Sequence, residues 1–157
     1  MDKIHLRGEL EELYADYAAC LDDGELERWP ELFTEQCRYE IIPRENFDRG
    51  LPLAVMRCES KAMLADRVAA LRRSSVYGPR ALRHLVSGLR ILAVEGDCIR
   101  AQASYAVLQT LPDEHTTVFN AGCYLDRVVR DNGVLKFQER LCVYDSVLVP
   151  GSQVIPI

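Results

Sequence analysis

Four long stretches in the second half of the chain show the alternation of apolar and polar residues that is typical of β-strands. We predict strands over residues 82–94, 98–111, 116–130 and 134–148. Tight turns separate them, at 95–97, at 112–114 and at 131–133, where Asn132-Gly133 favours a two-residue hairpin. About thirteen residues at roughly 3.3 Å each span roughly 43 Å, so such strands must coil and bend. Gly88 and Gly122 are the predicted bend points.

The first half of the chain instead shows the three-and-four spacing of helices. Residues 4–22 carry one apolar stripe, made of Leu6, Leu10, Leu13, Tyr14, Tyr17 and Leu21. Gly24 suits the left-handed residue that closes a helix, and a short second helix is predicted over 25–33. A third helix is predicted over 61–73, with Ser60 as its N-cap.

A short strand is predicted between these helices, over 37–42. Pro43 ends it, and residues 43–58 read as an extended loop that can include a short strand over 53–57. Helices first and one large antiparallel sheet afterwards indicate an α+β fold, with the helices packed on one face of the sheet. A strongly curved four-stranded sheet wrapped around helices makes a cone. The chain has 157 residues and no low-complexity stretch, so we expect one domain over 1–157.

The composition is that of a globular protein, with 48% apolar and 27% charged residues. A net charge of −5 argues against nucleic acid as a partner, because phosphate binding needs a concentrated basic face. One basic cluster reads either as a solvated helix face or as a docking surface for an acidic partner. It consists of Arg67, Arg72, Arg73, Arg80 and Arg83.

The sequence favours a cytoplasmic protein. No apolar run approaches the roughly 18 residues of a membrane-spanning helix. The first five residues, 1–5, lack the basic region and apolar core of a signal peptide. The six cysteines are scattered without a C-x-x-C motif, which favours reduced and mostly buried side chains.

The residues that carry chemistry form no recognisable motif. His5, His84 and His115 are not spaced with a second His or Cys as metal ligands would be. The nucleophile motif G-x-S-x-G and a glycine-rich phosphate loop are also absent from the sequence. We therefore expect no metal site in this chain, and no local motif indicates a catalytic nucleophile or a phosphate-bearing cofactor.

An acid–base pocket inside the cone is the enzyme hypothesis that survives. Tyr14 and Tyr17 on the first helix can face Tyr105 and His84 on the sheet, with Asp145 nearby. Isomerases and dehydratases of this shape use a histidine or carboxylate base with a tyrosine in an apolar cavity. The alternative is that the tyrosines are core residues with satisfied hydroxyls, and that the histidine and the aspartate bond locally.

Two apolar features indicate either core packing or contact with a partner. Trp29, the one tryptophan, is either a core residue or an anchor in an interface. Residues 147–157 are apolar, whereas free chain ends are usually polar and frayed. This favours docking of the segment onto the chain's own domain or onto a partner subunit.

Short motifs along nearly the whole chain resemble one family. They are a tyrosine-bearing first helix followed by Trp29-Pro30-Glu31-Leu32-Phe33-Thr34, Cys37-Arg38-Tyr39, Glu59-Ser60-Lys61, Met63-Leu64-Ala65-Asp66-Arg67, Arg83-His84, Tyr124-Leu125-Asp126, Glu139-Arg140, Val143-Tyr144-Asp145-Ser146 and the Pro-Ile ending. In this order and spacing, the chain resembles the small (β) subunits of Rieske-type aromatic-ring-hydroxylating oxygenases. The segment 43–52 is most similar to members that handle aromatic acids, such as salicylate 5-hydroxylase and, more distantly, terephthalate dioxygenase.

The resemblance implies a cone-shaped fold of the NTF2-like (cystatin-like) type. It implies a hexamer of three large (α) and three small (β) subunits, α3β3 in composition. The Rieske 2Fe–2S cluster and a mononuclear Fe(II) would belong to the large subunit, with NAD(P)H electrons arriving through a reductase and often a ferredoxin. Members of this family usually leave the cone of the small subunit without catalytic residues.

Three hypotheses follow. The first is a non-catalytic subunit that stabilises an oxygenase acting on an aromatic carboxylic acid. Its predicted interface residues are Trp29, Arg80, Arg83, His84, Tyr144, Asp145 and Ile157. The second is a free-standing isomerase or dehydratase, whose pocket residues are Tyr14, Tyr17, His84 and Tyr105. The third is a cone-shaped binding or dimerisation module.

Overall fold

The computed structural model describes residues 2–74, 78–146 and 155–157. Its first helix, α1 (Lys3–Asp22), forms where the apolar stripe predicts it, and the whole stripe is buried. Asp2 caps the helix, because its carboxylate accepts a 3.1 Å hydrogen bond from the Ile4 backbone N–H. Gly24 follows with a φ of 72°, the left-handed conformation that closes a helix. The sequence therefore sets both ends of this helix locally.

The other helical segments are the 3-10 helix η1 (Leu26–Leu32), α2 (Arg44–Asp48) and α3 (Lys61–Arg73). Ser60 caps α3 as predicted, since its hydroxyl accepts a 3.2 Å hydrogen bond from the Met63 backbone N–H. The prediction of an extended loop over 43–58, with a possible short strand over 53–57, is wrong at α2. This helix has five residues and no buried side chain, so it produces no periodic pattern that a sequence can reveal.

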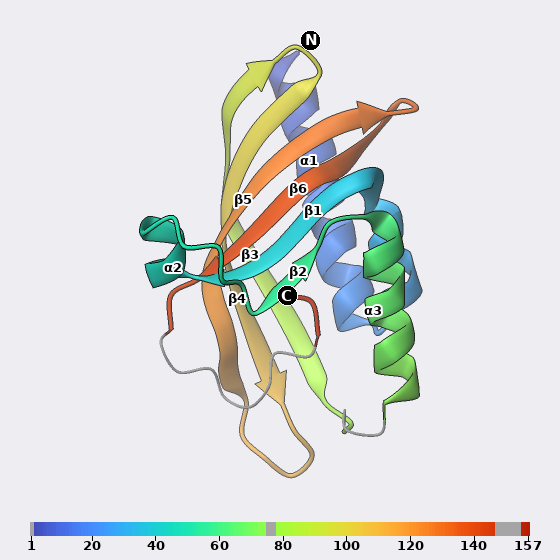
Figure 1. Cartoon of the computed structure of the whole chain (residues 1–157), viewed down its shortest axis with the longest axis vertical. Coiled ribbons are helices and arrows are strands. Elements are labelled where there is room, and N and C mark those ends of the chain that lie inside the picture. Colours follow the sequence, from blue (N-terminus) through green and yellow to red (C-terminus); the bar gives the residue numbers. More distant parts are fainter. Residues whose placement is uncertain (1, 75–77, 147–154) are drawn as a thin grey trace.

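The described residues form one six-stranded sheet in the order β2-β1-β6-β5-β4-β3 (Figure 1). The strands are β1 (Phe33–Pro43), β2 (Met56–Cys58), β3 (Ala81–Glu95), β4 (Cys98–Thr110), β5 (Thr117–Asp131) and β6 (Val134–Tyr144). The α+β prediction is confirmed. The four predicted long strands correspond to β3 to β6, and the sheet also contains β1 and β2, which overlap the short strands predicted over 37–42 and 53–57. β1 pairs with β6 in parallel, whereas the other neighbouring strands pair antiparallel.

The sheet bends at Gly88, one of the two predicted points. Gly88 has a φ of 65°, and the pairing of β3 with β4 shifts register between Ser87 and Arg90. Gly122 has a different reason to be glycine, because no register shift falls there. A Cβ atom at this position would lie 2.0 Å from the Val143 carbonyl oxygen of β6. The glycine therefore permits close approach of two backbones rather than a bulge.

The helices pack on the sheet in two places. α1 lies behind the strands in Figure 1 and contacts β3 and β6, while α3 contacts β1, β2 and η1. The core lies between α1 and the curved sheet, where aromatic residues from both meet. Within the described residues, no helix combines the length and the apolar character that a membrane span requires.

Candidate functional site

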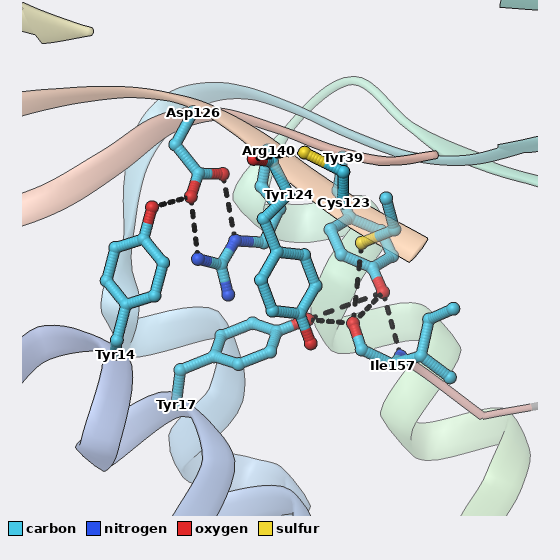
Figure 2. Close-up of polar contacts among 9 residues, drawn as sticks. Tyr14, Tyr17, Tyr39, Cys123, Tyr124, Asp126, Arg140 and Ile157 are labelled. Carbon is cyan, nitrogen blue, oxygen red and sulfur yellow. Dashed lines mark hydrogen bonds and ion pairs between the residues drawn. The ribbon is translucent and has the colours of Figure 1, made fainter. Parts of the chain in front are cut away.

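The interior of the cone, where one hypothesis places an acid–base pocket, contains an ion pair (Figure 2). Arg140 on β6 donates two hydrogen bonds to Asp126 on β5, from Nε at 2.9 Å and from Nη2 at 2.7 Å. Both side chains are 0% exposed, and the two residues are direct partners in the register of the two strands. The Tyr14 hydroxyl on α1 also donates to the Asp126 carboxylate. The pair therefore ties the helix to the sheet.

Aromatic rings surround the guanidinium of Arg140. Its central carbon lies 3.9 Å from the ring centroid of Phe137, 4.0 Å from Tyr124, 4.1 Å from Tyr17 and 4.6 Å from Tyr14. Cations at these distances are attracted by the negative faces of aromatic rings. The charged group and its rings, which we call the Arg140 cage, occupy the space that a substrate would need.

A second polar cluster in the same interior involves Ile157, the last residue of the sequence. Its carbonyl oxygen accepts hydrogen bonds from the hydroxyls of Tyr17 at 2.5 Å and Tyr39 at 3.0 Å. Its backbone N–H donates to the Tyr39 hydroxyl at 3.0 Å, and the Cys142 thiol lies 3.4 Å from the carbonyl oxygen. Ile157 is 0% exposed, so the end of the apolar segment docks on the chain's own domain.

Burial favours the neutral form of the tyrosine hydroxyls and of the cysteine thiol in this interior. Loss of solvent is the main cause that raises the pKa of five phenols, those of Tyr14, Tyr17, Tyr39, Tyr105 and Tyr124. It also raises the pKa of the Cys142 thiol to about 12. For Arg140, burial is the largest single influence and opposes the charge, but the attraction and hydrogen bonds of Asp126, together with Tyr14 and Tyr17, raise the guanidinium pKa. At neutral pH these phenols and the thiol stay protonated, so none of them is a ready base or nucleophile.

The other two residues of the predicted pocket are held by local partners. Tyr105 donates a 2.8 Å hydrogen bond to Asn120 and stacks on Tyr124 with ring centroids 4.3 Å apart. His84 contacts Asp22 through Nδ1 at 2.6 Å, and its side chain is 0% exposed. The structure thus brings Tyr14 and Tyr17 together around Arg140, while His84 and Tyr105 sit at the margins of that cluster.

Asp145 does not join the interior, contrary to the pocket hypothesis. Its side chain is 60% exposed and pairs with Arg44, whose Nε and Nη2 each lie 3.1 Å from the same carboxylate oxygen. A surface hollow of about 400 Å³ between α1 and β3 includes Tyr14 and His84 in its lining. Both residues are more than nine-tenths buried, so the hollow reaches little of their polar surface.

No metal centre appears in the described parts of the chain, 2–74, 78–146 and 155–157, where no three His, Cys, Asp or Glu side chains gather to hold an ion. The six cysteines are free thiols, four of them buried and Cys98 and Cys123 half-buried. The Arg140 cage and the Ile157 contacts are therefore polar clusters without a metal-binding set among the described residues.

Comparisons with known proteins place this architecture in a family. The family model of the SnoaL-like domain matches residues 2–141. The chain is 41% identical to the small subunit of anthranilate 1,2-dioxygenase from Burkholderia cepacia, over 90% of this chain and 88% of that one. The chain belongs to the small subunits of the aromatic-ring-hydroxylating dioxygenases.

Further relatives of this small subunit agree. A β subunit of the terminal oxygenase component of terephthalate 1,2-dioxygenase from Comamonas is 35% identical, over 91% of this chain and 93% of that one. The crystal structure of the β subunit of a candidate aromatic-ring-hydroxylating dioxygenase from Novosphingobium aromaticivorans superposes with a TM-score of 0.84. That chain is 45% identical, with 91% of each chain covered. The family resemblance and the NTF2-like fold predicted from the sequence are confirmed.

Several predicted interface residues of the small subunit lie inside it. Trp29 and Ile157 are 0% exposed, Tyr144 is 6% exposed, and the His84 side chain is closed off as well. Trp29 packs edge-on against Phe33 and Tyr39, with ring centroids 5.8 and 5.0 Å away. In this fold these side chains are core residues, because the cone of the subunit itself provides the apolar partner that an interface anchor needs.

The remaining predicted interface residues stay on the surface. Arg83 is exposed on β3, and Asp145 is exposed beyond β6. Arg80 is half-buried and donates a 2.9 Å hydrogen bond to Gln109. Contact of these three residues with another subunit stays a prediction.

The sequence reasoning assigned no role to Asp126, Arg140 or Tyr39, although it quoted all three among the family motifs. A signal was present. Tyr124 and Asp126 are two residues apart on one strand, so they share a face, and Arg140 belongs to the next strand of the hairpin. An acidic and a basic residue on core-facing positions of paired strands indicate a buried ion pair.

Proposed function

We propose that this small subunit is the non-catalytic, structural component of a Rieske non-haem iron oxygenase that hydroxylates an aromatic carboxylic acid. The single observation that carries the proposal is the match to the small subunit of anthranilate 1,2-dioxygenase along nearly the full length of both chains. Two of its relatives carry the names of enzymes for anthranilate and terephthalate, which are both aromatic carboxylates. A salicylate-like acid is therefore the substrate class of the holoenzyme.

The Arg140 cage supports the structural role over the acid–base alternative. A general base must reach the proton of a substrate, yet the Asp126 carboxylate already accepts hydrogen bonds from Tyr14 and from Arg140 in a buried site. Both carboxylate oxygens of Asp126 are also occupied by the bidentate guanidinium of Arg140, which leaves neither of them directed at a substrate. The interior thus resembles a packed core more than a reaction chamber.

The proposed partner is a large oxygenase subunit. It would contain the Rieske 2Fe–2S cluster and the mononuclear Fe(II), and the two chains would assemble as a hexamer of three large and three small subunits. A reductase that oxidises NAD(P)H, with a ferredoxin between, would supply electrons to the large subunit. The assembly would work in the cytoplasm.

Co-expression with the large subunit encoded beside this chain tests the proposal. The complex is purified through a tag on the small subunit, and its mass is measured by light scattering during size-exclusion chromatography. We expect co-elution at a mass near six chains, with iron in the complex and none in the small subunit purified alone. A small subunit that elutes alone as a monomer or dimer, whatever the amount of large subunit that is co-expressed, would contradict the proposal.

A further inference from the structure

The described end of the chain, residues 155–157, lies in a pocket built from three separate elements. Tyr17 comes from α1, Tyr39 from β1 and Cys142 from β6. Ile155 is 3% exposed and Ile157 is 0% exposed. We call the three side chains that bond the Ile157 backbone the tail seat. Figure 2 shows the Tyr17 and Tyr39 hydroxyls converging on Ile157 from different directions.

The tail seat recognises the backbone N–H and C=O of a single residue, Ile157, through side chains rather than through a sheet ladder. The Tyr39 hydroxyl uses both of its capacities on Ile157, since it accepts from the backbone N–H and donates to the carbonyl oxygen, each at 3.0 Å. The Tyr17 hydroxyl donates to the same oxygen. Such a donor and acceptor set fits any apolar residue with a free backbone N–H and C=O, because none of these bonds reads the side chain.

Removing residues 155–157 from the tail seat should destabilise the folded chain. Tyr17, Tyr39 and Cys142 are all buried, so without Ile157 their polar atoms would lose hydrogen-bond partners that water reaches poorly. The side chains of Ile155 and Ile157 would also leave apolar surface uncovered. An occupant with the same chemistry is therefore strongly favoured, whether or not it belongs to the same chain.

We propose that the tail seat is a peptide-binding site for a short apolar segment, and that residues 155–157 fill it as an intramolecular ligand. The chemical class of the ligand is a peptide with two branched aliphatic residues and an accessible amide between them, of which Ile-Pro-Ile is this chain's version. Binding closes the interior by joining α1, β1 and β6. The inference concerns the chain alone and stands independently of the oxygenase assembly.

Cys142 reports whether the seat is filled. Its thiol lies 3.4 Å from the Ile157 carbonyl oxygen and is fully buried, so a thiol reagent reaches it only when the segment leaves. Cys58 on β2 is 2% exposed and makes no hydrogen bond to residues 155–157, the described part of the segment, which makes it a control for global unfolding. Labelling rates at each cysteine are measured by mass spectrometry.

The first experiment uses a chain that ends at residue 154, with circular dichroism to show that it is folded. We expect Cys142 to react at least about tenfold faster than in the full chain, while Cys58 keeps its rate. The peptide acetyl-Ile-Pro-Ile, added in excess, is expected to restore the slow rate saturably, and acetyl-Asp-Pro-Asp is not. Unchanged Cys142 labelling, or a folded shortened chain that the peptide does not protect, would overturn the proposal.

A second variant keeps the proposal testable if the shortened chain does not fold. Tyr39→Phe in the full chain removes both hydrogen bonds between that hydroxyl and Ile157 but keeps the ring. Because each bond contributes modestly, we expect Cys142 labelling to rise about tenfold with Cys58 unaffected. The matched control is Tyr105→Phe, which removes a hydroxyl bonded to Asn120 and should leave Cys142 at its original rate. Equal labelling in both variants and the unaltered chain would refute the tail seat.

Discussion

Arg140 is a charged side chain that is buried in the centre of a small protein. Three kinds of contact compensate for the free-energy cost of this burial. Asp126 supplies the opposite charge, Tyr14 donates to that carboxylate, and aromatic faces surround the guanidinium. Removing two charges from water is expensive, so a buried pair adds little net stability compared with apolar residues of equal volume. Breaking the pair on one side is a different matter, because it leaves one buried charge without a partner.

Replacing Arg140 alone should therefore cost more than replacing both partners. We expect Arg140→Met to lower the free energy of unfolding by about 3–5 kcal/mol, because Asp126 is left buried and charged. The double variant Arg140→Met with Asp126→Leu should recover at least half of that loss. Urea denaturation of the three proteins measures both effects. A double variant that is less stable than the single one would mean that the pair itself stabilises the fold.

The buried phenols predict a loss of stability in alkali. Their pKa values are raised in the folded chain, so folding holds these protons more tightly than the unfolded chain does. These groups contribute fully to the free energy of unfolding when the pH is below their pKa values in the unfolded chain, which are near 9 for the thiol and 10 for the phenols. The contribution is lost as the pH rises above those values. We expect the urea midpoint to stay level from pH 7 to 9 and to fall beyond about pH 10.

Tyr124→Phe isolates one of these groups. The Tyr124 hydroxyl is buried and has no hydrogen-bond partner among the described residues, so its removal should be neutral or stabilising at pH 7. Above pH 10 the variant should lose stability less steeply, by about 1.4 kcal/mol per pH unit, because one phenol fewer ionises on unfolding. An identical alkaline slope in the two proteins would show that Tyr124 titrates equally in both states.

At the scale of elements, the backbones of β5 and β6 approach each other closely at Gly122. The two strands approach so closely there that a Cβ atom would meet three neighbouring backbone atoms of β6, including the Val143 carbonyl carbon at 2.8 Å. Backbone atoms cannot rotate away as a flexible side chain can, so the strands would have to separate. The same two strands carry Asp126 and Arg140, and the ion pair depends on their spacing.

Gly122→Ala should consequently destabilise the fold by about 1–3 kcal/mol or more. The matched control is Gly8→Ala in α1, where a Cβ atom meets nothing within 4 Å and alanine favours the helix. That control should raise stability by roughly 0.5–1 kcal/mol. Thermal unfolding of both variants measures the difference. Equal effects of the two substitutions would contradict the close approach described here.

The elements that the sequence predicts well are those with a local pattern. α1 has its stripe and its caps, and the hairpin between β5 and β6 has Asn132 with a φ of 50° and Gly133 with a φ of 85° at its turn. The parallel pairing of β1 with β6 joins residues such as Arg38 and Glu139, which are about a hundred positions apart. No local periodicity encodes such a pairing, so the sequence predicts a short strand over 37–42 but not its place in the sheet beside β6.

At the scale of the whole molecule, the sequence predicted the family and the fold but not the chemistry of the interior. The pocket hypothesis named Tyr14 and Tyr17 correctly as inward residues, yet it missed that Arg140 would occupy the space between them. A strand pattern shows which residues face inward and not what they meet there. The interface residues could not be predicted reliably for the same reason, because an apolar residue such as Trp29 is equally suited to a core and to an interface.

A partner surface should therefore be sought among the exposed predicted residues. We expect Arg83→Glu on β3 to weaken the complex with the large subunit at least about tenfold, because reversing a charge in an interface creates repulsion. The free small subunit should keep its urea midpoint, since Arg83 is exposed. Affinity is measured by titrating labelled small subunit with the large chain.

Arg90→Glu is the matched control for this prediction. Arg90 is exposed on the same strand and is not among the predicted contacts. Its reversal should change affinity by less than about threefold, as is usual for charges outside an interface. Equal weakening by the two substitutions would indicate a general electrostatic effect and would remove Arg83 from the proposed contacts.

The central claim is that this chain acts by building the oxygenase and not by chemistry of its own. The most direct test is turnover per iron of the assembled oxygenase with the small-subunit variant Tyr14→Phe and His84→Asn, on anthranilate, terephthalate and salicylate. Both residues belong to the alternative acid–base pocket. We predict turnover within about twofold of the unaltered complex at equal mass and iron content. A loss of about a hundredfold or more, which removal of an acid–base group typically causes, would contradict the account.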